Sequence, residues 1–110
     1  LGDVREASVP KVTLVSAPRE GGVISTRSFI PHRVHASIGV LAAVSVATAC
    51  LLRGSPAAAL ASLPTDGRFA IEHPSGSFEA FLEIGSDGAV LGAGTVRTAR
   101  KLMDGMVFPA

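Results

Sequence analysis

The sequence predicts an α+β fold in which a curled, mostly antiparallel sheet surrounds one central, buried helix. Residues 34–52 contain no Asp, Glu, Lys or Arg, as expected of a helix that is buried on every side. The β-rich segments around it are joined by tight turns, which favours antiparallel pairing. Aromatic residues make up only 5% of the chain, so small and aliphatic side chains must fill the core. A flat sheet cannot cover such a helix, and we therefore expect the sheet to curl.

The part of the chain before the helix predicts a leading segment and two strands. Residues 1–10 are mixed and polar and end in proline, which indicates a loop or linker. Residues 11–17 are β-rich and are followed by Pro18, as a strand would be. After a turn at 19–22, residues 23–30 predict a second strand, which Pro31 ends because it lacks a backbone donor.

The charge-free stretch at 34–52 has two interpretations, a buried central helix and a membrane-spanning segment. Its length falls at the low edge of the roughly 17–25 residues that cross a bilayer. It is rich in small residues, and Arg33 and Arg53 flank it symmetrically. We therefore favour the buried helix and expect no membrane association.

The remainder of the chain predicts a helix end and four strands. Gly54 and Pro56 are the expected stop for the helix, and residues 57–63 add another turn or two. Alternating apolar residues and turn signals then predict four strands: one around Phe69 and Ile71, one over 78–84, one over 89–98 and one over 101–108, with a turn or bulge at 104–105.

Length and charge limit the class of protein. The 110 residues fit one compact domain or a piece of a larger protein. Ten basic against nine acidic residues, without runs of one sign, argue against a nucleic-acid partner. The single Cys50 excludes an internal disulfide, and no signal sequence is recognisable, so we expect a cytoplasmic protein. The chain begins with Leu1, and we expect an N-terminal part to precede it.

Residues 26–37 concentrate cationic, imidazole and hydroxyl groups directly before the predicted helix. Unpaired N–H groups and the helix dipole favour an anion at such a place. This predicts a carboxylate site, with the alternative that the arginines are solvated and the histidines fill a loop. His32 and His35 could hold a metal, but no third ligand has useful spacing, and we expect none. We expect a structural role for His73, and core packing with a raised pKa for Cys50.

Four segments in this order and spacing resemble the PrpF family, which includes 4-oxalomesaconate tautomerases and aconitate isomerases. The segments are residues 27–40, residues 42–49, the motif Glu-His-Pro-Ser-Gly at 72–76, and residues 97–105. The resemblance covers nearly the whole chain from Lys11 onward. It implies that residues 11–110 are the C-terminal half of a diaminopimelate-epimerase-like fold, in which two curled halves meet at their helix N-termini.

The resemblance also implies a function. Such enzymes shift a proton on an unsaturated di- or tricarboxylic acid without metal or organic cofactor, and their proton-moving Lys and Cys are expected from the N-terminal half. Where related epimerases carry a second catalytic Cys, this chain has no thiol at 35–38. The resemblance therefore carries over only substrate-carboxylate binding, with His35 as an open candidate for proton exchange; the substrate-binding candidates are Arg27, His32, Arg33, His35, Ser37 and Ile38, the last two through backbone N–H groups.

Two functions from different classes remain open at this stage. The first is a cofactor-independent isomerase or tautomerase, present as its C-terminal substrate-binding half; its partners would be the small acid, the N-terminal half and, in one arrangement, a second copy in a homodimer. The second is a catalytically silent domain that acts only as a binding or assembly module.

Overall fold

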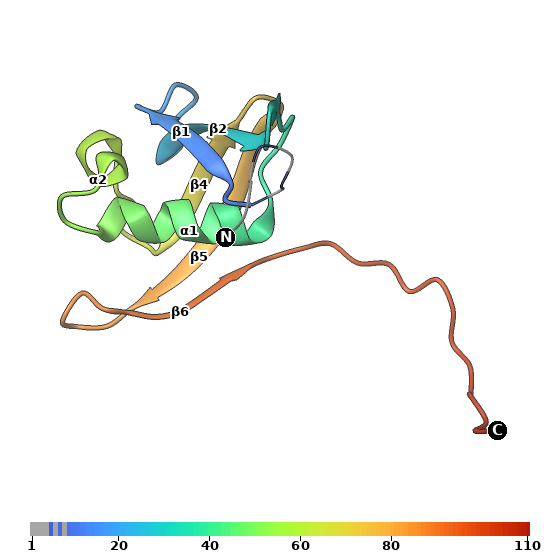
Figure 1. The fold of residues 1–110 in the computed structure, drawn as a ribbon. Coiled ribbons are helices and arrows are strands. Elements are labelled where there is room, and N and C mark those ends of the chain that lie inside the picture. The colour runs from blue at the N-terminus through green and yellow to red at the C-terminus, as the bar shows by residue number, and fades with distance from the viewer. Residues whose placement is uncertain (1–4, 6, 8) are drawn as a thin grey trace.

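The structure is a computed structural model and describes residues 5, 7 and 9–110. Six strands and two helices follow one another along these residues (Figure 1), with these bounds: β1 (Val12–Ser16), β2 (Ile24–Ile30), β3 (Arg33–Val34), α1 (Val40–Leu51), α2 (Pro56–Leu60), β4 (Arg68–His73), β5 (Gly76–Ile84) and β6 (Val90–Thr95).

The strands form one curled sheet in the order β1-β2-β4-β5-β6, with β3 paired to β2. Neighbouring strands are antiparallel except β2 and β4, which run parallel. That parallel ladder is short, because it pairs only Ile24 with Ile71 and Ser25 with Glu72. The curled, mostly antiparallel sheet predicted from the sequence is thus confirmed, and its two antiparallel parts meet at one narrow seam.

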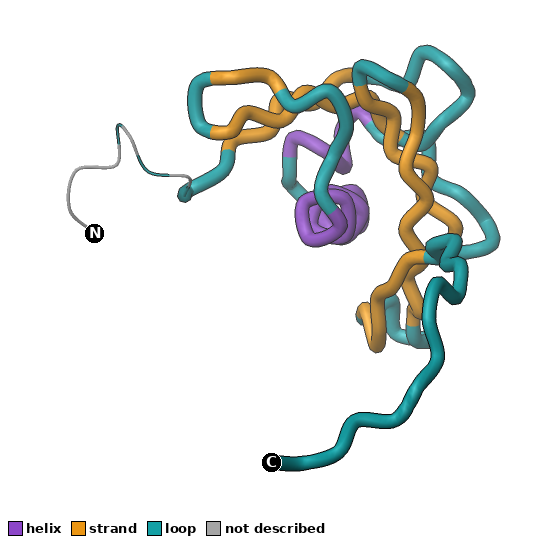
Figure 2. The backbone as a smooth tube through the Cα atoms, turned by 90° about the vertical axis from the view of Figure 1, so that its right-hand side faces the viewer, coloured by secondary structure: helices purple, strands orange, loops and turns teal. Residues whose placement is uncertain are grey.

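Helix α1 lies in the concave side of the sheet, as the view along the helix shows (Figure 2). Its buried residues are Ala43, Val46, Ala47 and Cys50, which recur at the three- and four-residue spacing of one helix face. Opposite them, Ile24, Phe69 and Ile71 are among the largest fully buried side chains. The small side chains of α1 allow the helix to lie close to the larger side chains of the sheet.

The central helix differs from the prediction in length and in coverage. It occupies 12 residues, 40–51, whereas the charge-free stretch spans 34–52. The first residues of that stretch are used otherwise, because Val34 pairs with Phe29 in the short strand β3. The described sheet and α2 cover only part of the surface of α1, and Leu41 on its uncovered side is 83% exposed.

The helix ends where the sequence predicts. Gly54 has φ +85°, a conformation that side chains with a Cβ rarely adopt and that commonly follows a helix. The next helix, α2, begins at Pro56, and the Ser55 hydroxyl accepts a hydrogen bond from the Ala58 amide at 3.0 Å. This is the usual N-cap arrangement, which satisfies one of the unpaired amides at a helix start.

The strand predicted over 101–108 is not formed, and this prediction is wrong for the structure. Residues 96–110 contain neither helix nor strand and run away from the sheet in Figure 1. The β5–β6 ladder ends at the pair Ala80 and Thr95. A strand needs a paired neighbour, and no described segment lies beside these residues to supply one.

Two further expectations concern the chain as a whole. Most of the predicted linker at 1–10 lies outside the described residues. Among the residues that are described, no helix is both long and apolar enough to span a bilayer.

The close approach of α1 to the sheet predicts the effect of a larger side chain. Ala43 is 0% exposed, so Ala43→Leu should overpack the interface and lower the free energy of unfolding by about 1–3 kcal/mol. Denaturant unfolding measures this difference. Leu41→Ala, on the exposed side of the same helix, is the matched control and should change stability by less than about 0.5 kcal/mol. Equal losses in both variants would contradict the close packing.

Candidate functional site

Two His-x-Ser turns interlock at the start of α1. In the first turn, the Ser37 amide donates to Nδ1 of His35 at 3.0 Å. In the second, the Ser75 amide donates to Nδ1 of His73 at 3.3 Å. Each serine hydroxyl then reaches across, Ser37 Oγ to Nε2 of His73 at 3.4 Å and Ser75 Oγ to the carbonyl of Ala36 at 2.6 Å. We call these residues the paired His-x-Ser turns.

The backbone amides determine which ring nitrogen carries the proton. An amide N–H only donates, so Nδ1 of His35 and of His73 must be acceptors, and each neutral ring carries its hydrogen on Nε2. His73 then donates from Nε2 to the Ser37 hydroxyl oxygen. The hydroxyl hydrogen of Ser37 is left to be donated to another acceptor, and the paired turns therefore present hydrogen-bond donors.

The first amides of α1 add further donors beside these turns. The first intrahelical bond runs from the Ala43 amide to the Gly39 carbonyl at 2.9 Å, so the preceding amides have no partner within the helix. Gly39 is the N-cap and offers no side-chain cap. Ile38, 4% exposed, anchors this helix start in the core. The helix start therefore carries the partial positive charge that favours an anion.

The structure groups some of the predicted site residues and separates others. His35, Ser37 and Ile38 lie together at the helix start. The Ser37 amide, which the sequence analysis expected to bind substrate, already donates to Nδ1 of His35 and is not free for that role. His32 in the β2–β3 connection and Arg33 at the start of β3 are both exposed, and the His32 ring contacts the carbonyl of Arg5. Arg27 lies in β2 on the sheet face opposite α1, since alternate residues of a strand point to opposite faces.

A buried carboxylate that sequence analysis did not single out lies at the seam of the sheet. Glu72 is 4% exposed. Its Oε1 accepts hydrogen bonds from the amides of Glu20 and Gly22 at 2.7 and 2.8 Å, and its Oε2 accepts one from the Arg19 amide at 2.8 Å. Its carbonyl also accepts from the Thr26 hydroxyl at 2.6 Å. Glu72 therefore fastens the β1–β2 turn to β4.

The hydrogen bonds keep Glu72 ionised in spite of its burial. Burial alone would raise the pKa of this carboxyl, but the amides of Arg19, Glu20 and Gly22, with a bond from Ser25, outweigh it and hold the pKa below its ordinary value of 4.5. The turn approaches so closely that a Cβ at Gly22 would lie 2.7 Å from the Ala70 carbonyl oxygen. A glycine is required there for lack of space.

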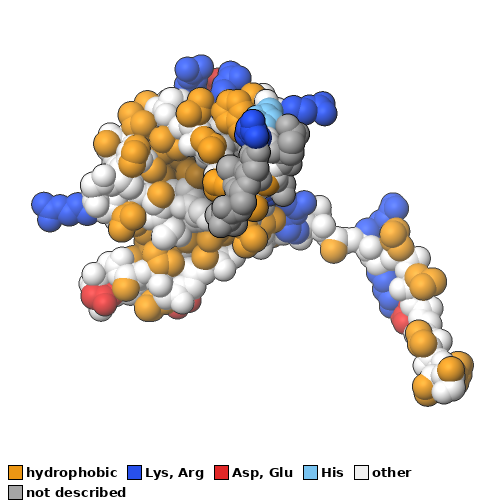
Figure 3. Space-filling model, in the orientation of Figure 1, with side chains coloured by type: hydrophobic (Ala, Val, Ile, Leu, Met, Phe, Trp, Pro, Cys, Tyr) orange, Lys and Arg blue, Asp and Glu red, His pale blue; other side chains and the backbone are white. Residues whose placement is uncertain are grey.

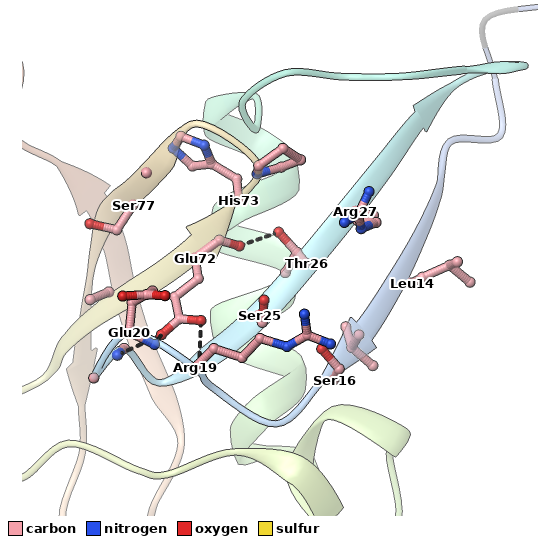
Figure 4. A pocket seen from close by; sticks show the side chains of 16 residues that line it. Leu14, Ser16, Arg19, Glu20, Ser25, Thr26, Arg27, Glu72, His73 and Ser77 are labelled. Atoms are coloured by element: carbon pink, nitrogen blue, oxygen red, sulfur yellow. Dashed lines mark hydrogen bonds between the residues drawn. The ribbon is translucent and has the colours of Figure 1, made fainter.

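Glu72 also lines a pocket of about 860 Å³ on the outer face of the sheet. Figure 4 shows its side chain pointing from β4 toward the turn that carries Arg19 and Glu20, with Arg27 on the neighbouring strand. The polar lining mixes both signs of charge, because Arg19 and Arg27 face Glu20 and Glu72. The pocket therefore lacks the uniform positive charge of the helix start.

The described residues do not favour catalysis by a thiol or binding of a metal ion. Burial raises the pKa of the Cys50 thiol to about 11, although a backbone hydrogen bond partly opposes this, so the thiol is a poor nucleophile. The sequence prediction for Cys50 is confirmed. No group of three His, Cys, Asp or Glu side chains among the described residues is placed to hold a metal ion.

Sequence reasoning missed the partnership of His73 and Ser75 with the helix start. The tripeptides His35-Ala36-Ser37 and His73-Pro74-Ser75 repeat one pattern, and this repetition is a signal that could have been noticed. The contact between the two turns depends on the position of β4 in the sheet. The repeated tripeptide does not specify that position.

Comparison with known proteins places this chain in a family. The family model described as "PrpF protein" matches residues 2–109. The chain belongs to the PrpF family. The resemblance inferred from the four sequence segments is thereby confirmed.

Curated relatives in the PrpF family are named as isomerases. The chain is 60% identical over 110 residues to the (4E)-oxalomesaconate Delta-isomerase of Novosphingobium sp. strain KA1, covering 98% of this chain and 31% of that protein. It is 59% identical to the 4-oxalomesaconate tautomerase of Pseudomonas putida strain KT2440, covering 97% of this chain and 30% of that protein. A putative isomerase of Escherichia coli strain K12 is 35% identical, with 98% and 31% covered. The chain thus spans about a third of the length of these relatives.

A solved structure of the same fold supports the architecture. The crystal structure of a methylitaconate-delta-isomerase matches with a TM-score of 0.78 at 16% identity, over 93% of this chain and 30% of that chain. The described part of this PrpF chain thus has the diaminopimelate-epimerase-like architecture of a curled sheet around a central helix.

The contact between the paired His-x-Ser turns predicts an energetic coupling. In a double-mutant cycle of Ser37→Ala and His73→Ala, the two losses of stability should fall short of additivity by about 0.5–1 kcal/mol, because either change alone breaks the shared contact. Denaturant unfolding of the four proteins measures it. The control cycle pairs His73→Ala with Ser45→Ala, whose hydroxyl donates to Leu41 elsewhere on α1, and should show no coupling.

The Glu72 contacts predict how stability depends on pH. Because the pKa of Glu72 in the folded protein lies below its ordinary value, its contribution is complete above pH of about 4.5 and is lost as pH falls through the folded-state pKa. Glu72→Gln places an NH₂ group against a backbone N–H and should cost about 2 kcal/mol at neutral pH. Denaturant unfolding between pH 3 and 7 should show this difference shrinking toward low pH. A constant difference would contradict the assignment.

Proposed function

We propose that this chain is the C-terminal part of a cofactor-independent isomerase or tautomerase of unsaturated di- or tricarboxylic acids. In this proposal its described residues bind a carboxylate of the substrate at the start of α1. The observation that carries the proposal is the array of hydrogen-bond donors at the paired His-x-Ser turns, in a chain of the PrpF family.

The names of the relatives support the reaction class. Two of them, about 60% identical to this chain, are named as an isomerase and a tautomerase of oxalomesaconate. We extend that substrate class to the present protein. The reaction would move a proton from one carbon to another and shift a double bond, which leaves the number of atoms and electrons in the substrate unchanged.

The geometry supports carboxylate binding by residues of this chain. The Ser37 hydroxyl and Nε2–H of His35 are donors, and the unpaired amides after Ile38 contribute the dipole of α1. His32 in the β2–β3 connection and Arg33 at the start of β3 precede these groups and would add positive charge. We leave Arg27 out of this set because it lies on the opposite face of the sheet.

A carboxylate held in this way favours proton abstraction from the neighbouring carbon. Loss of that proton produces an enolate-like anion whose charge spreads onto the carboxylate, and fixed donors stabilise it. Cys50 does not serve as the acid or base, because it is buried and its thiol pKa is raised to about 11. We place the main acid and base in polypeptide outside residues 1–110, with His35 as the candidate within this chain.

The first test is the activity of the full-length protein in which this chain is embedded. We expect it to interconvert isomers of an unsaturated tricarboxylate such as oxalomesaconate, and proton NMR in deuterium oxide should show deuterium entering the shifted position. If the protein isomerises no di- or tricarboxylate, the proposal fails in favour of a silent binding or assembly module.

Two substitutions then test the carboxylate site. Ser37→Ala and Arg33→Ala should each raise KM by about 10- to 100-fold, since one charge-assisted contact contributes roughly 1.5–3 kcal/mol. The matched controls are Ser45→Ala on the exposed side of α1 and Arg53→Ala after its C-terminus, which should leave KM unchanged. Steady-state kinetics provides the comparison, and equal KM values in all four variants would refute the site.

A further inference from the structure

A row of side chains on the concave face of the sheet ends in an arginine. Ile24, Ile71 and Phe78 are direct partners on the neighbouring strands β2, β4 and β5. The two isoleucines are fully buried, and Phe78 packs against the same core. The ladder between β5 and β6 ends before this row, but the Arg97 guanidinium still lies over the Phe78 ring, 5.8 Å from its centroid. Arg97 is therefore on the side of the sheet that carries α1, which β6 also contacts.

The row that contains Phe78 lies next to the row that reaches the start of α1. His73 and Gly76 are opposite each other at the ends of β4 and β5, and the His73 ring contacts the Ser37 hydroxyl. Phe78 follows Gly76 by two residues, which places the two rows about 7 Å apart, since a strand rises about 3.4 Å per residue. A small acid seated at the paired His-x-Ser turns is therefore within reach of the long side chain of Arg97.

A comparison of two stacked arginines shows that the charge of Arg97 is not neutralised. Arg68 lies over the Phe81 ring at 5.2 Å, and its guanidinium is 3.6 Å from Glu79 and 4.0 Å from Asp66. The described part of the chain offers Arg97 no carboxylate within ion-pair distance. Stacking on a ring restricts a guanidinium but leaves its N–H edge open to an acceptor. Arg97 is thus an oriented donor without an acidic partner in this part of the chain.

Positive side chains gather where the chain leaves the sheet after β6. Figure 3 shows Lys and Arg side chains there and along the projecting segment, which contains Arg97, Arg100 and Lys101. Lys101 pairs with Asp104, whereas the described residues supply no carboxylate to the two arginines. An anion beside Arg97 therefore meets net positive charge, in contrast to the mixed charge of the pocket on the outer face of the sheet.

We propose that Arg97 determines substrate specificity by binding a second carboxylate of the acid, apart from the one held at the start of α1. The inference rests on the proposed function, because it assumes the carboxylate site at the paired His-x-Ser turns. A guanidinium donates two parallel hydrogen bonds to a carboxylate. Stacking on Phe78 orients it before the acid arrives, so little side-chain freedom is lost on binding. An acid with a neutral group at this position leaves those donors unpaired and is rejected.

Steady-state kinetics of the full-length protein tests Arg97 with oxalomesaconate and with its mono-amides, in each of which one carboxylate is a neutral carboxamide. Arg97→Ala should lower kcat/KM for the acid about 10- to 100-fold, the range of one hydrogen-bonded charge pair. For one of the amides it should lower kcat/KM less than about 2-fold, because the partner of Arg97 is already missing. Where an amide is not turned over, its inhibition constant replaces kcat/KM. An equal loss on every substrate, or no loss on the acid, would overturn the proposal.

Further variants separate binding by Arg97 from its packing on Phe78. Arg97→Gln keeps an aliphatic stem over the ring without the charge, and should lose as much activity as Arg97→Ala even if the alanine variant is too unstable to assay. Arg97→Lys keeps the charge without the planar fork and should lose about 3- to 10-fold. The matched control is Arg68→Ala, which removes a stacked arginine from the opposite face and should change kcat/KM less than about 2-fold. Full activity in Arg97→Gln, or equal losses in Arg97→Gln and Arg68→Ala, would contradict the role of Arg97.

Calorimetric titration with the same acid distinguishes failure of this inference from failure of the proposed function. A wild-type protein that binds the acid about 10-fold more tightly than Arg97→Gln does, but isomerises nothing, would refute the proposed function and leave the role of Arg97 standing. A wild-type protein that isomerises the acid with the same specificity as Arg97→Gln would refute the role of Arg97 alone. A protein that neither binds nor isomerises the acid would refute both.

Discussion

The carboxylate of Glu72 holds the two antiparallel parts of the sheet together, and the remaining architecture depends on that junction. The parallel ladder between β2 and β4 pairs only two residues of each strand, which is little backbone bonding for a seam. Glu72 adds three amide bonds from the β1–β2 turn, and Val23 adds one to the Ala70 carbonyl at 2.8 Å. With the seam fixed, β2 and β4 can curl around α1, and the paired His-x-Ser turns meet at the helix start.

The parts of the fold that the sequence predicts are those set by local patterns. Strands β1 and β2 and the end of α1 near Gly54 follow from alternation, turn residues and a helix stop. The parallel pairing of β2 with β4 could not be derived, because it joins residues 24 and 71 through contacts that no local pattern specifies. The charge-free stretch predicts too early a start for α1, because Val34 is apolar enough for a helix but pairs with Phe29 in a hairpin.

The sequence predicts where the candidate site lies along the chain, but it does not predict the contacts among the residues of the site. A cluster of His, Arg and Ser before an apolar stretch indicated an anion site, and His35 and Ser37 do lie at the helix start. The role of His73 was missed since its partner Ser37 is 36 residues away in sequence. Arg27 was included because it is near in sequence, but strand alternation turns it to the outer face. The buried Glu72 escaped notice because its partners are backbone amides, which every sequence contains.

The separation along the chain between Glu72 and its partners has a consequence for synthesis on the ribosome. Arg19 and Glu72 are 53 residues apart, and translation at about 5–20 residues per second delays the carboxylate by several seconds after the turn emerges. During that interval β1 and β2 can pair only with each other and with the two-residue strand β3, and so small a sheet is marginally stable in water. The side chain of Ile24, which is fully buried in the complete sheet, stays exposed and can contact other proteins. The nascent chain is therefore most vulnerable to misassociation before residue 72 has left the exit tunnel.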